Sequence, residues 1–531
     1  MINQKGYAMK LRHRIGLVYL PGALPCFEAF GSLPTDLVRE DGLVEGKPTS
    51  EALDMIIVPG GSLVESQTIK GNVAQEILKM ADAGKFVLGI CSGFQILSRG
   101  TDIGRLSPTP ILKKGLGLLD AEFKPLICTD QVQATVVGAS QLTDQIGATV
   151  SGFHCHTYGD VTLHKNAKPI LVSHVQHLDY RKRQQDLVSG ITNAKGNVVG
   201  ILPHAVLDQN PIIIQGVTKS LNINPAELKE IRSANAKLLS VIKNELGIST
   251  GIHPENKTVA PKSKTPRALL ITALESGSGK TFIVTGLAGA LKKRGVNVGV
   301  VKIGGDIRDA VPALYLIKEP LRNYSSIKVA DCGWKSHLDV VKEALVDYDF
   351  LIIEGAMDSF TGILYSQLEK PRSTAEIAAS LGVPTVVVVG CDKEGIEGGM
   401  VGALNYVSLL KSLGVKVVGV ILNRMCMGYL TDEIKVIIKQ AFANANVELL
   451  GIVPLVDVVG RGTIPEVEIK YEDFGAKALE AAEQSLYFDI IMEVAAPPAV
   501  TELDYEAFFE KFKKSLLTDP RANTPERGKQ S

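Results

Sequence analysis

The stretch ALLITALESGSGKTFIVTGLAGALKKRG (residues 268–295) decides the fold of the second half of the chain. It reads as an apolar strand, a glycine-rich loop and an Ala/Leu-periodic helix. Backbone N–H groups of such a loop can surround a phosphate at the helix N-terminus, where the helix dipole favours anions. The expected phosphate-binding residues are Ser276, Gly277, Ser278, Gly279, Lys280 and Thr281. Lys280 would reach the β- and γ-phosphates of ATP, and the Thr281 hydroxyl would bind Mg²⁺.

This loop departs from the strict GxxxxGK[ST] pattern, because Leu274 stands where the pattern needs glycine. The alternative interpretation is an ordinary glycine-rich turn between a strand and a helix. The preceding apolar strand and the following periodic helix favour nucleotide binding.

Carboxylates follow two other strands of this half. Asp306 lies just beyond the strand in VNVGVVKIGGDIRD (296–309), and Glu354 ends the strand in DFLIIEGAMDSFTG (349–362). Ligands of open parallel sheets bind at the carboxyl ends of the strands, so Asp306, Glu354 and Thr281 are predicted to share one Mg²⁺. Taken singly, an acidic residue after a strand is more often a helix N-cap.

Two further polar residues of this half are candidates for the nucleotide site. Lys302, just before the Asp306 loop, could offset the charge of a phosphate or carboxylate. Asn423 ends the strand VVGVILNRM (417–425), where its amide could read the edge of a base. Asparagine is also common in ordinary turns, so that signal is weak alone.

The first half of the chain contains a cysteine on a sharp turn. KFVLGICSGFQIL (85–97) is an apolar strand, a turn at Cys91 and a helix, which is the cysteine form of a nucleophile elbow. The helix N-terminus lowers the pKa of a thiol placed there. Gly60 and Gly61 end an upstream strand and, with Ser92, are the expected oxyanion donors. The alternative is a buried core thiol.

A thiolate nucleophile needs a general base, and the histidines must supply it. His204 follows the apolar strand in GNVVGILPHAVLDQNP (196–211), where a catalytic side chain is expected. His154 and His156, which flank Cys155, are the rival candidates. A metal held by this His-Cys-His run is a minor alternative, because no further ligand cluster lies nearby.

Composition excludes several classes of function. Lys and Arg number 57 and Asp and Glu number 57, so the neutral chain is not expected to bind nucleic acid. No apolar run approaches the roughly 20 residues that span a bilayer, and the polar start lacks a signal peptide, so no membrane association is expected. The seven cysteines include no CxxC pair, which predicts a reduced, cytoplasmic protein.

Alternating apolar and amphipathic segments predict an α/β fold with two doubly wound domains and mainly parallel sheets. The polar, proline-bearing stretch 249–266 is the expected linker. The predicted organisation is a first domain at 1–222, a helix and linker at 223–266, a second domain at 267–494, and a C-terminal helix with a disordered tail at 495–531.

The second half resembles the amidotransferase-coupled synthetases of corrinoid biosynthesis, the cobyrinate a,c-diamide synthase and cobyric acid synthase family, whose P-loop ATPase domain is related to dethiobiotin synthetase. The matching segments are SGSGKT, VKIGGDIRD, LIIEGAMDSFTG, STAEIAASLGVPTVVVVG and GVILNR, in that order. EGAM followed by glycine is more similar to the diamide synthases. The resemblance implies that residues 276–281 bind ATP, that Asp306 and Glu354 bind Mg²⁺, and that Asn423 contacts adenine. Ala273 and the run GGDIRD depart from the family pattern.

The first half resembles the class I glutamine amidotransferase domain of the same family, which has a flavodoxin-like fold. GICSGFQIL, KKGLGLLDAEF, SGFHCHTYGD and GNVVGILPHAVLD are the matching segments. The resemblance implies that Cys91 is the nucleophile, His204 the base and Gly60 an oxyanion donor. Val206 stands where most such domains have a glutamate that orients the histidine, and Asp208 is a candidate replacement. In the family the ATPase domain usually comes first, whereas here it comes second.

Together the two resemblances imply ATP- and glutamine-dependent amidation of carboxylates on a corrinoid or related tetrapyrrole. Ammonia released at the cysteine would react with an acyl phosphate. One alternative is another acid, such as nickel sirohydrochlorin. A second is a ParA/MinD-like regulatory ATPase with a non-catalytic amidotransferase domain, although Glu275 replaces the signature lysine of those ATPases. The sequence leaves open whether the chain forms a homo-oligomer.

Overall fold

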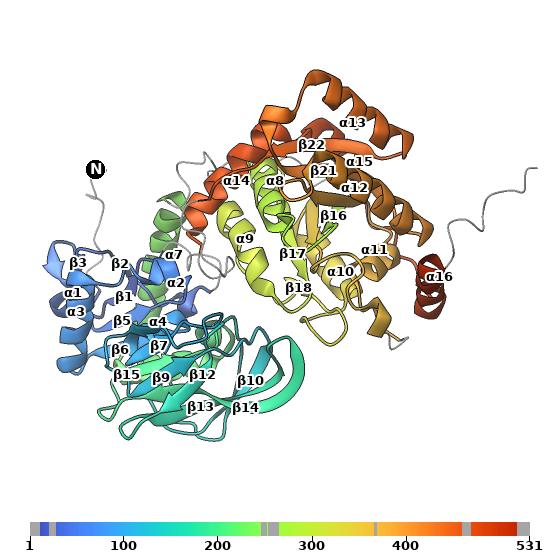
Figure 1. The fold of residues 1–531 in the computed structure, drawn as a ribbon. Helices are drawn as coiled ribbons and strands as arrows, with labels where there is room; N and C mark the ends of the chain where they lie inside the picture. Colours follow the sequence, from blue (N-terminus) through green and yellow to red (C-terminus); the bar gives the residue numbers. More distant parts are fainter. Residues whose placement is uncertain are drawn as a thin grey trace, which may run out of the picture.

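The computed structural model describes residues 11–20, 28–245, 252, 265–365, 369–458 and 469–517. Two α/β domains lie side by side in Figure 1: residues 11–245 from blue to green and residues 265–517 from yellow to red. The predicted α/β fold with a parallel-strand sheet is confirmed. Most of the predicted linker and of the C-terminal tail lie outside the described residues. Among the described helices, none has the length and apolar character to cross a membrane.

The first domain, within the described residues, is built on a nine-stranded sheet of order β11-β10-β13-β14-β15-β6-β5-β1-β2. The strands from β15 to β2 are parallel and bury nearly all their side chains. These five strands are β15 (Val198–Ile201), β6 (Phe86–Ile90), β5 (Met55–Val58), β1 (Ile15–Val18) and β2 (Asp36–Val38). The helices of this domain are α1 (Thr49–Ala52), α2 (Leu63–Ser66), α3 (Gly71–Asp82), α4 (Ser92–Leu97), α5 (Val206–Gln209), α6 (Pro211–Ser220) and α7 (Pro225–Glu245), with the 3₁₀ turn η2 (Phe30–Ser32).

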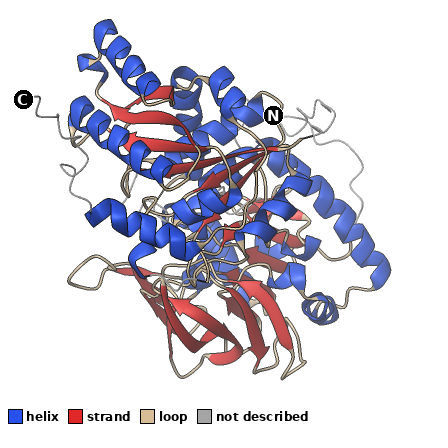
Figure 2. Cartoon of the chain, turned by 90° about the vertical axis from the view of Figure 1, so that its right-hand side faces the viewer, coloured by secondary structure: helices blue, strands red, loops and turns tan. Residues whose placement is uncertain are grey.

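The other half of this sheet is antiparallel, which the expectation of mainly parallel sheets missed. It consists of β11 (Thr149–Phe153), β10 (Gln131–Val136), β13 (Lys168–Leu178) and β14 (Arg181–Thr192). Buried and exposed side chains alternate along β10, as is typical of an antiparallel strand with one solvated face. Smaller sheets complete the domain: β7 (Gly100–Asp102), β8 (Leu112–Lys114), β9 (Ala121–Lys124) and β12 (Asp160–Leu163), and the hairpin β3 (Leu43–Val44) and β4 (Lys47–Pro48). Figure 2 shows the strands of this half at the bottom of the molecule.

The second domain contains, in its described residues, a seven-stranded parallel sheet of order β18-β17-β19-β16-β20-β21-β22. The strands are β16 (Arg267–Ala273), β17 (Val298–Ile303), β18 (Ser326–Ile327), β19 (Phe350–Glu354), β20 (Thr385–Gly390), β21 (Val417–Met425) and β22 (Glu448–Pro454). Both faces are covered by helices, as the continuous apolar strands require. The helices are α8 (Lys280–Lys293), α9 (Val311–Ile317), α10 (His337–Asp347), α11 (Thr374–Leu381), α12 (Gly395–Ser412), α13 (Asp432–Asn444), α14 (Tyr471–Ser485), α15 (Phe488–Val494) and α16 (Tyr505–Leu517), with the short turns η4 (Ile307–Ala310), η5 (Ile363–Tyr365) and η6 (Met427–Tyr429).

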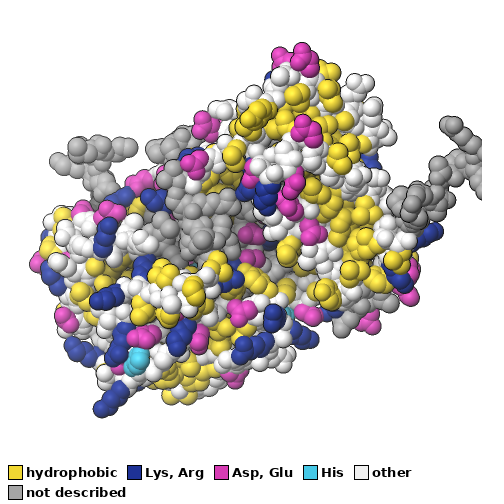
Figure 3. Space-filling model, viewed as in Figure 1, with side chains coloured by type: hydrophobic (Ala, Val, Ile, Leu, Met, Phe, Trp, Pro, Cys, Tyr) yellow, Lys and Arg dark blue, Asp and Glu magenta, His cyan; other side chains and the backbone are white. Residues whose placement is uncertain are grey.

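The two domains contact each other directly. Trp334 of the second domain donates its indole N–H to Thr129 O of the first at 2.9 Å. Tyr471 N donates to Glu65 Oε1 at 3.2 Å. Basic and acidic side chains are interspersed over the face of the molecule that Figure 3 shows. The loop before α10 and the N-terminus of α14 therefore lie against the first domain.

Candidate active site

Cys91 occupies a strained turn between β6 and α4. Its φ of 51° and ψ of −111° lie outside the regions that L-residues prefer. Strain of this kind is typical of functional positions that the surrounding structure enforces. The turn needs glycine at position 93, since a Cβ built there would lie 1.9 Å from Val58 O. The sequence interpretation of 85–97 as an elbow therefore has a steric basis.

We expect Gly93→Ala to destabilise the first domain by about 3 kcal/mol, because the added methyl group must displace the backbone of β5. Thermal unfolding monitored by circular dichroism measures the change. Gly428→Ala, in the second domain, is the control for an added methyl group, since nothing lies within 4 Å of a Cβ built at Gly428 and its φ is not positive. An unchanged melting temperature for Gly93→Ala would contradict the steric argument.

His204 lies beside Cys91 and is buried. A Cβ built at Gly60 would be 2.6 Å from His204 Cε1 and 3.1 Å from Cys91 Cβ, so these three residues meet at one point. Burial lowers the pKa of His204, but Cys91 and a nearby carboxylate outweigh it and raise that pKa to about 10. The ring stacks on Phe153 with centroids 5.3 Å apart. The imidazole is therefore positioned to exchange a proton with the thiol.

Glu28 is the carboxylate that holds this histidine, and the sequence analysis missed it. Its Oε1 accepts from His204 Nδ1 at 3.0 Å and its Oε2 accepts from Ala205 N at 3.0 Å. Both side chains of the His204–Glu28 pair are 1% exposed. Burial raises the pKa of Glu28, and the bonds to His204 and Ala205 oppose that rise.

Asp208, the predicted candidate for orienting His204, binds the backbone next to Glu28 and not the histidine. Its carboxylate accepts from Ala29 N at 2.8 Å and from Gly31 N at 2.6 Å. It therefore anchors the segment that carries Glu28 instead of contacting His204. Val206 is buried and supplies no polar group.

The rival histidines form a separate buried pair. His156 Nε2 lies 2.9 Å from His154 Nδ1, and the ring of His156 reaches Leu126 O. Burial lowers the pKa of His154 well below its ordinary value and that of His156 to about 3. Cys155 faces the nucleophile through its carbonyl, 3.7 Å from Cys91 Sγ. Within the described ranges, no group of three or more His, Cys, Asp and Glu side chains could hold a metal ion.

The expected oxyanion donors lie around the thiol. Gly60 is in contact range of both Cys91 and His204. Gly61 follows it in the loop that leads to α2. Ser92 begins α4, and its hydroxyl accepts from Ser66 Oγ at 2.9 Å. Their role in stabilising an oxyanion stays a prediction.

In the second domain, residues 276–281 form the loop between β16 and α8. Gly277 and Gly279 have φ angles of 86° and 88°, a conformation that favours glycine. The Lys280 ammonium donates to Met357 O. Burial and the nearby Lys302 lower the pKa of Lys280 to about 8, against the opposing effect of nearby carboxylates. A bound polyphosphate would replace the lost solvation of this ammonium.

Thr281 and Glu354 meet beneath this loop. Thr281 Oγ1 donates to Glu354 Oε1 at 2.7 Å, and Lys302 Nζ lies 3.2 Å from the same oxygen. The other oxygen, Oε2, is buried without a hydrogen-bond partner among the described residues. Burial raises the pKa of Glu354. A buried carboxylate oxygen with no partner beside a hydroxyl fits Mg²⁺, which prefers such oxygen ligands.

Two predicted residues of the nucleotide site make other contacts. Asp306 receives the Arg308 guanidinium on both oxygens, at 2.7 Å each, and the Tyr180 hydroxyl at 2.7 Å. Asp306 thus contacts Tyr180 of the first domain, and among the described residues its hydrogen bonds go to Tyr180 and Arg308 and not to Thr281. Asn423 is buried and donates from Nδ2 to Ser278 O at 2.8 Å, so it supports the phosphate-binding loop from below.

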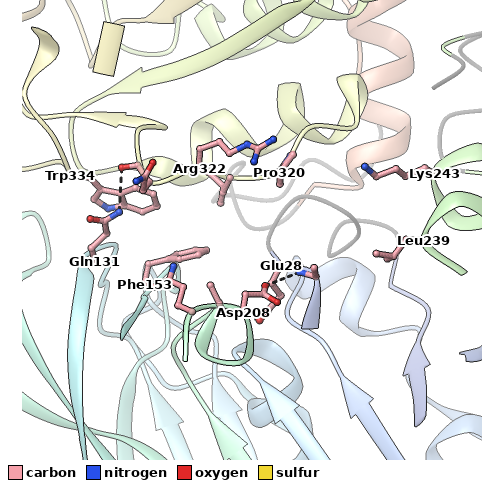
Figure 4. Close-up of a pocket in the computed structure, with 14 residues that line it drawn as sticks. Glu28, Gln131, Phe153, Asp208, Leu239, Lys243, Pro320, Arg322 and Trp334 are labelled. Carbon is pink, nitrogen blue, oxygen red and sulfur yellow. Dashed lines mark hydrogen bonds between the residues drawn. The ribbon is translucent and has the colours of Figure 1, made fainter. Parts of the chain in front are cut away.

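A cavity of about 370 Å³ lies between the domains next to Glu28 (Figure 4). Phe153 and Asp208 line its floor, and Trp334 and Arg322 face them from the second domain. Lys243 closes one end. The cavity therefore borders the carboxylate that holds His204.

Two family models match the chain. Residues 15–212 match the CobB/CobQ-like glutamine amidotransferase domain. Residues 269–463 match the CobQ/CobB/MinD/ParA nucleotide binding domain. The matched segments contain both sites described above.

Curated relatives include hydrogenobyrinate a,c-diamide synthase of Mycobacterium tuberculosis, 33% identical over 35% of this chain and 39% of that protein. Cobyrinate a,c-diamide synthase of Streptococcus sanguinis is 27% identical over 44% of this chain and 50% of that protein. The chain thus spans half or less of the length of these relatives. Among solved structures, PurLQS from Thermotoga maritima is 21% identical, with 39% of this chain and 99% of that chain covered and a TM-score of 0.29.

Proposed function

We propose, from the premise that this chain joins a CobB/CobQ-like glutamine amidotransferase domain to a CobQ/CobB/MinD/ParA nucleotide binding domain, that it is an ATP- and glutamine-dependent amide synthetase. The observation that carries the proposal is the buried chain of contacts from Glu28 through His204 to Cys91. A decayed, regulatory amidotransferase domain would have no need to keep these three groups together.

In the amidotransferase domain, the Cys91 thiolate would attack the side-chain amide of L-glutamine. His204 would take the thiol proton of Cys91, with Glu28 stabilising the charged ring, and would then give that proton to the departing ammonia. Water would then hydrolyse the thioester to release glutamate. Gly60, Gly61 and Ser92 are the proposed donors to the oxyanion.

In the nucleotide-binding domain, residues 276–281 would hold the phosphates of ATP. Thr281 and Glu354 would hold Mg²⁺, which when bound neutralises charge on the phosphates. Lys280 would stabilise the γ-phosphoryl group as it passes to a carboxylate of the acceptor. Ammonia would then displace phosphate from the acyl phosphate and leave an amide.

One chain that carries both sites keeps the ammonia local, by the effective-concentration argument for linked modules. The relatives are named for diamide and cobyric acid synthesis, so a corrinoid with side-chain carboxylates is the proposed acceptor. A cytoplasmic location is part of the same proposal. The oligomeric state stays open.

The proposal is tested by incubating the purified full chain with L-glutamine, Mg-ATP and cobyrinic acid. We expect glutamate, ADP and amidated product, detected by mass spectrometry as replacement of a carboxyl hydroxyl by an amino group. Nickel sirohydrochlorin in a parallel reaction distinguishes the alternative acceptor. ATP binding without glutamate release under every condition would contradict the enzyme proposal and favour a regulatory ATPase.

A further inference from the structure

The short turn η4 (Ile307–Ala310) of the nucleotide-binding domain reaches into the amidotransferase domain. Arg308, in this turn, is 2% exposed and donates to the Thr157 hydroxyl and to the Tyr180 hydroxyl. Asp306 neutralises the guanidinium from the same loop. A buried arginine that donates two hydrogen bonds across a domain boundary, with its charge neutralised within its own domain, fixes the two domains at this point.

The partner surface is itself held in an uncommon conformation. Asp179 and Tyr180 form the two-residue tip between β13 and β14, with φ angles of 50° and 61°. Such tips normally carry asparagine and glycine, because both residues need positive φ. The Tyr180 hydroxyl contacts Arg308 and Asp306, which compensates for the strain of that tip.

On the amidotransferase side, the Arg308 contact lies close to the nucleophile. Thr157 follows Cys155 by two residues, and Cys155 O lies 3.7 Å from Cys91 Sγ. The intervening His156 contacts Leu126 O through its ring and pairs with Cys128 through its backbone, and Thr157 O accepts from Leu126 N, so residues 126–128 hold this short segment in place. A shift of the guanidinium would therefore change the wall that faces Cys91.

Asp309, the residue after Arg308, contacts the nucleotide site of the second domain. Asp309 lies 2.7 Å from Lys302 Nζ, and Lys302 lies 3.2 Å from Glu354. Glu354 in turn accepts from the Thr281 hydroxyl. Two neighbouring side chains of η4 thus reach both sites: Arg308 contacts Thr157 near the thiol, and Asp309 contacts Lys302 near Glu354.

We propose that Arg308 is a positioning residue of the amidotransferase site, supplied by the nucleotide-binding domain, and that Asp309 makes its position depend on bound nucleotide. The inference rests on the proposed function. Mg-nucleotide at Thr281 and at Glu354 Oε2 weakens the attraction between this carboxylate and Lys302, which contacts Oε1. Lys302, which also donates to Gly355 O at 3.1 Å, then interacts more strongly with Asp309, and this alters the placement of η4 and of the guanidinium against Thr157. Glutamine hydrolysis is faster in that state.

The test measures glutamate release from glutamine by the full chain, with and without Mg²⁺ and a non-hydrolysable ATP analogue. We expect the analogue to raise the wild-type kcat about tenfold with little change in KM, a size typical of coupling between sites. Asp309→Asn and Thr157→Val are expected to reduce this response to less than about twofold. Thr157→Val keeps the side-chain size and lies in the other domain. Its response to the analogue therefore tests the role of Arg308 even if Asp309→Asn folds poorly.

Glu483→Gln is the matched control. Glu483 pairs with Lys293 at 2.9 Å and is 30% exposed, whereas Asp309 pairs with Lys302 at 2.7 Å and is 28% exposed. Glu483→Gln should respond to the analogue as the wild type does. A wild-type response in Thr157→Val, or no wild-type response despite active glutamine hydrolysis, overturns the inference alone. Absence of Cys91-dependent hydrolysis overturns the proposed function as well.

Discussion

We expect Cys91→Ala to lower the proposed glutamine-dependent amide formation by on the order of 10⁴-fold, because the variant lacks the thiol that would form the thioester. Ammonium chloride at alkaline pH, which supplies free ammonia, restores amide formation in this variant. The nucleotide-binding domain is unaffected by the change, since Cys91 lies in the other domain. Mass spectrometry of the product and an assay of glutamate release measure the two halves of the reaction separately.

The matched control is Cys128→Ala. Cys128 is also a buried thiol of the amidotransferase domain, and burial raises its pKa. Among the described residues its backbone pairs with His156 and not with His204, so its loss should leave glutamine-dependent activity intact. Equal loss of activity in the two variants, or persistent glutamate release by Cys91→Ala, would show that the nucleophile is misassigned.

Glu28→Gln is the second variant with a large expected effect. A glutamine amide can donate a hydrogen bond to His204 Nδ1, which leaves the ring proton on the nitrogen that must accept from Cys91. The wrong tautomer should reduce kcat for glutamine hydrolysis by on the order of 10³-fold. The rate at which iodoacetamide alkylates Cys91 at neutral pH should fall together with this kcat.

The pH dependence gives this variant a signature that loss of packing would not produce. Burial lowers the pKa of His204, but Cys91 and Glu28 together outweigh it and raise that pKa to about 10. The charged ring therefore adds its full contribution to the free energy of unfolding below its unfolded pKa of about 6.5. That contribution is lost as the pH rises through about 10, where the ring becomes neutral. Without the carboxylate that pKa falls, so the alkaline decline of glutamine hydrolysis moves to lower pH.

Glu227→Gln is the control for this experiment, because Glu227 also holds a histidine ring. Its Oε1 lies 2.9 Å from His13 Nδ1 in the same domain, away from the thiol. We expect the wild-type pH profile in Glu227→Gln. If the alkaline decline of glutamine hydrolysis stays at the wild-type pH in Glu28→Gln, another group orients and charges His204.

Local sequence signals were sufficient for the two loops at the centre of each site. The phosphate-binding loop and the cysteine turn are each specified within a few residues, by glycines that the backbone conformation or a close approach requires. His204 followed from its place directly after a buried strand. These features depend on neighbours in the sequence, which is why they could be predicted.

Features that depend on tertiary contacts could not be predicted in this way. Glu28 meets His204 across 176 residues, and nothing around position 28 marks it. Asp306 and Asp309 lie in one turn, so only the path of the backbone decides which of them turns toward Lys302 and which toward the other domain. The antiparallel half of the first sheet was missed because parallel packing was extended from the apolar strands to strands that alternate.

The distance in sequence between His204 and its carboxylate also bears on how this site can be transplanted. Where the two groups are close neighbours in sequence, a single grafted segment carries both. Here a chimera that exchanges only residues 196–211 would import the histidine without the group that orients it. Exchange of this site between homologous chains therefore requires two separate segments, one with Glu28 and one with His204, together with the Asp208 anchor that joins them.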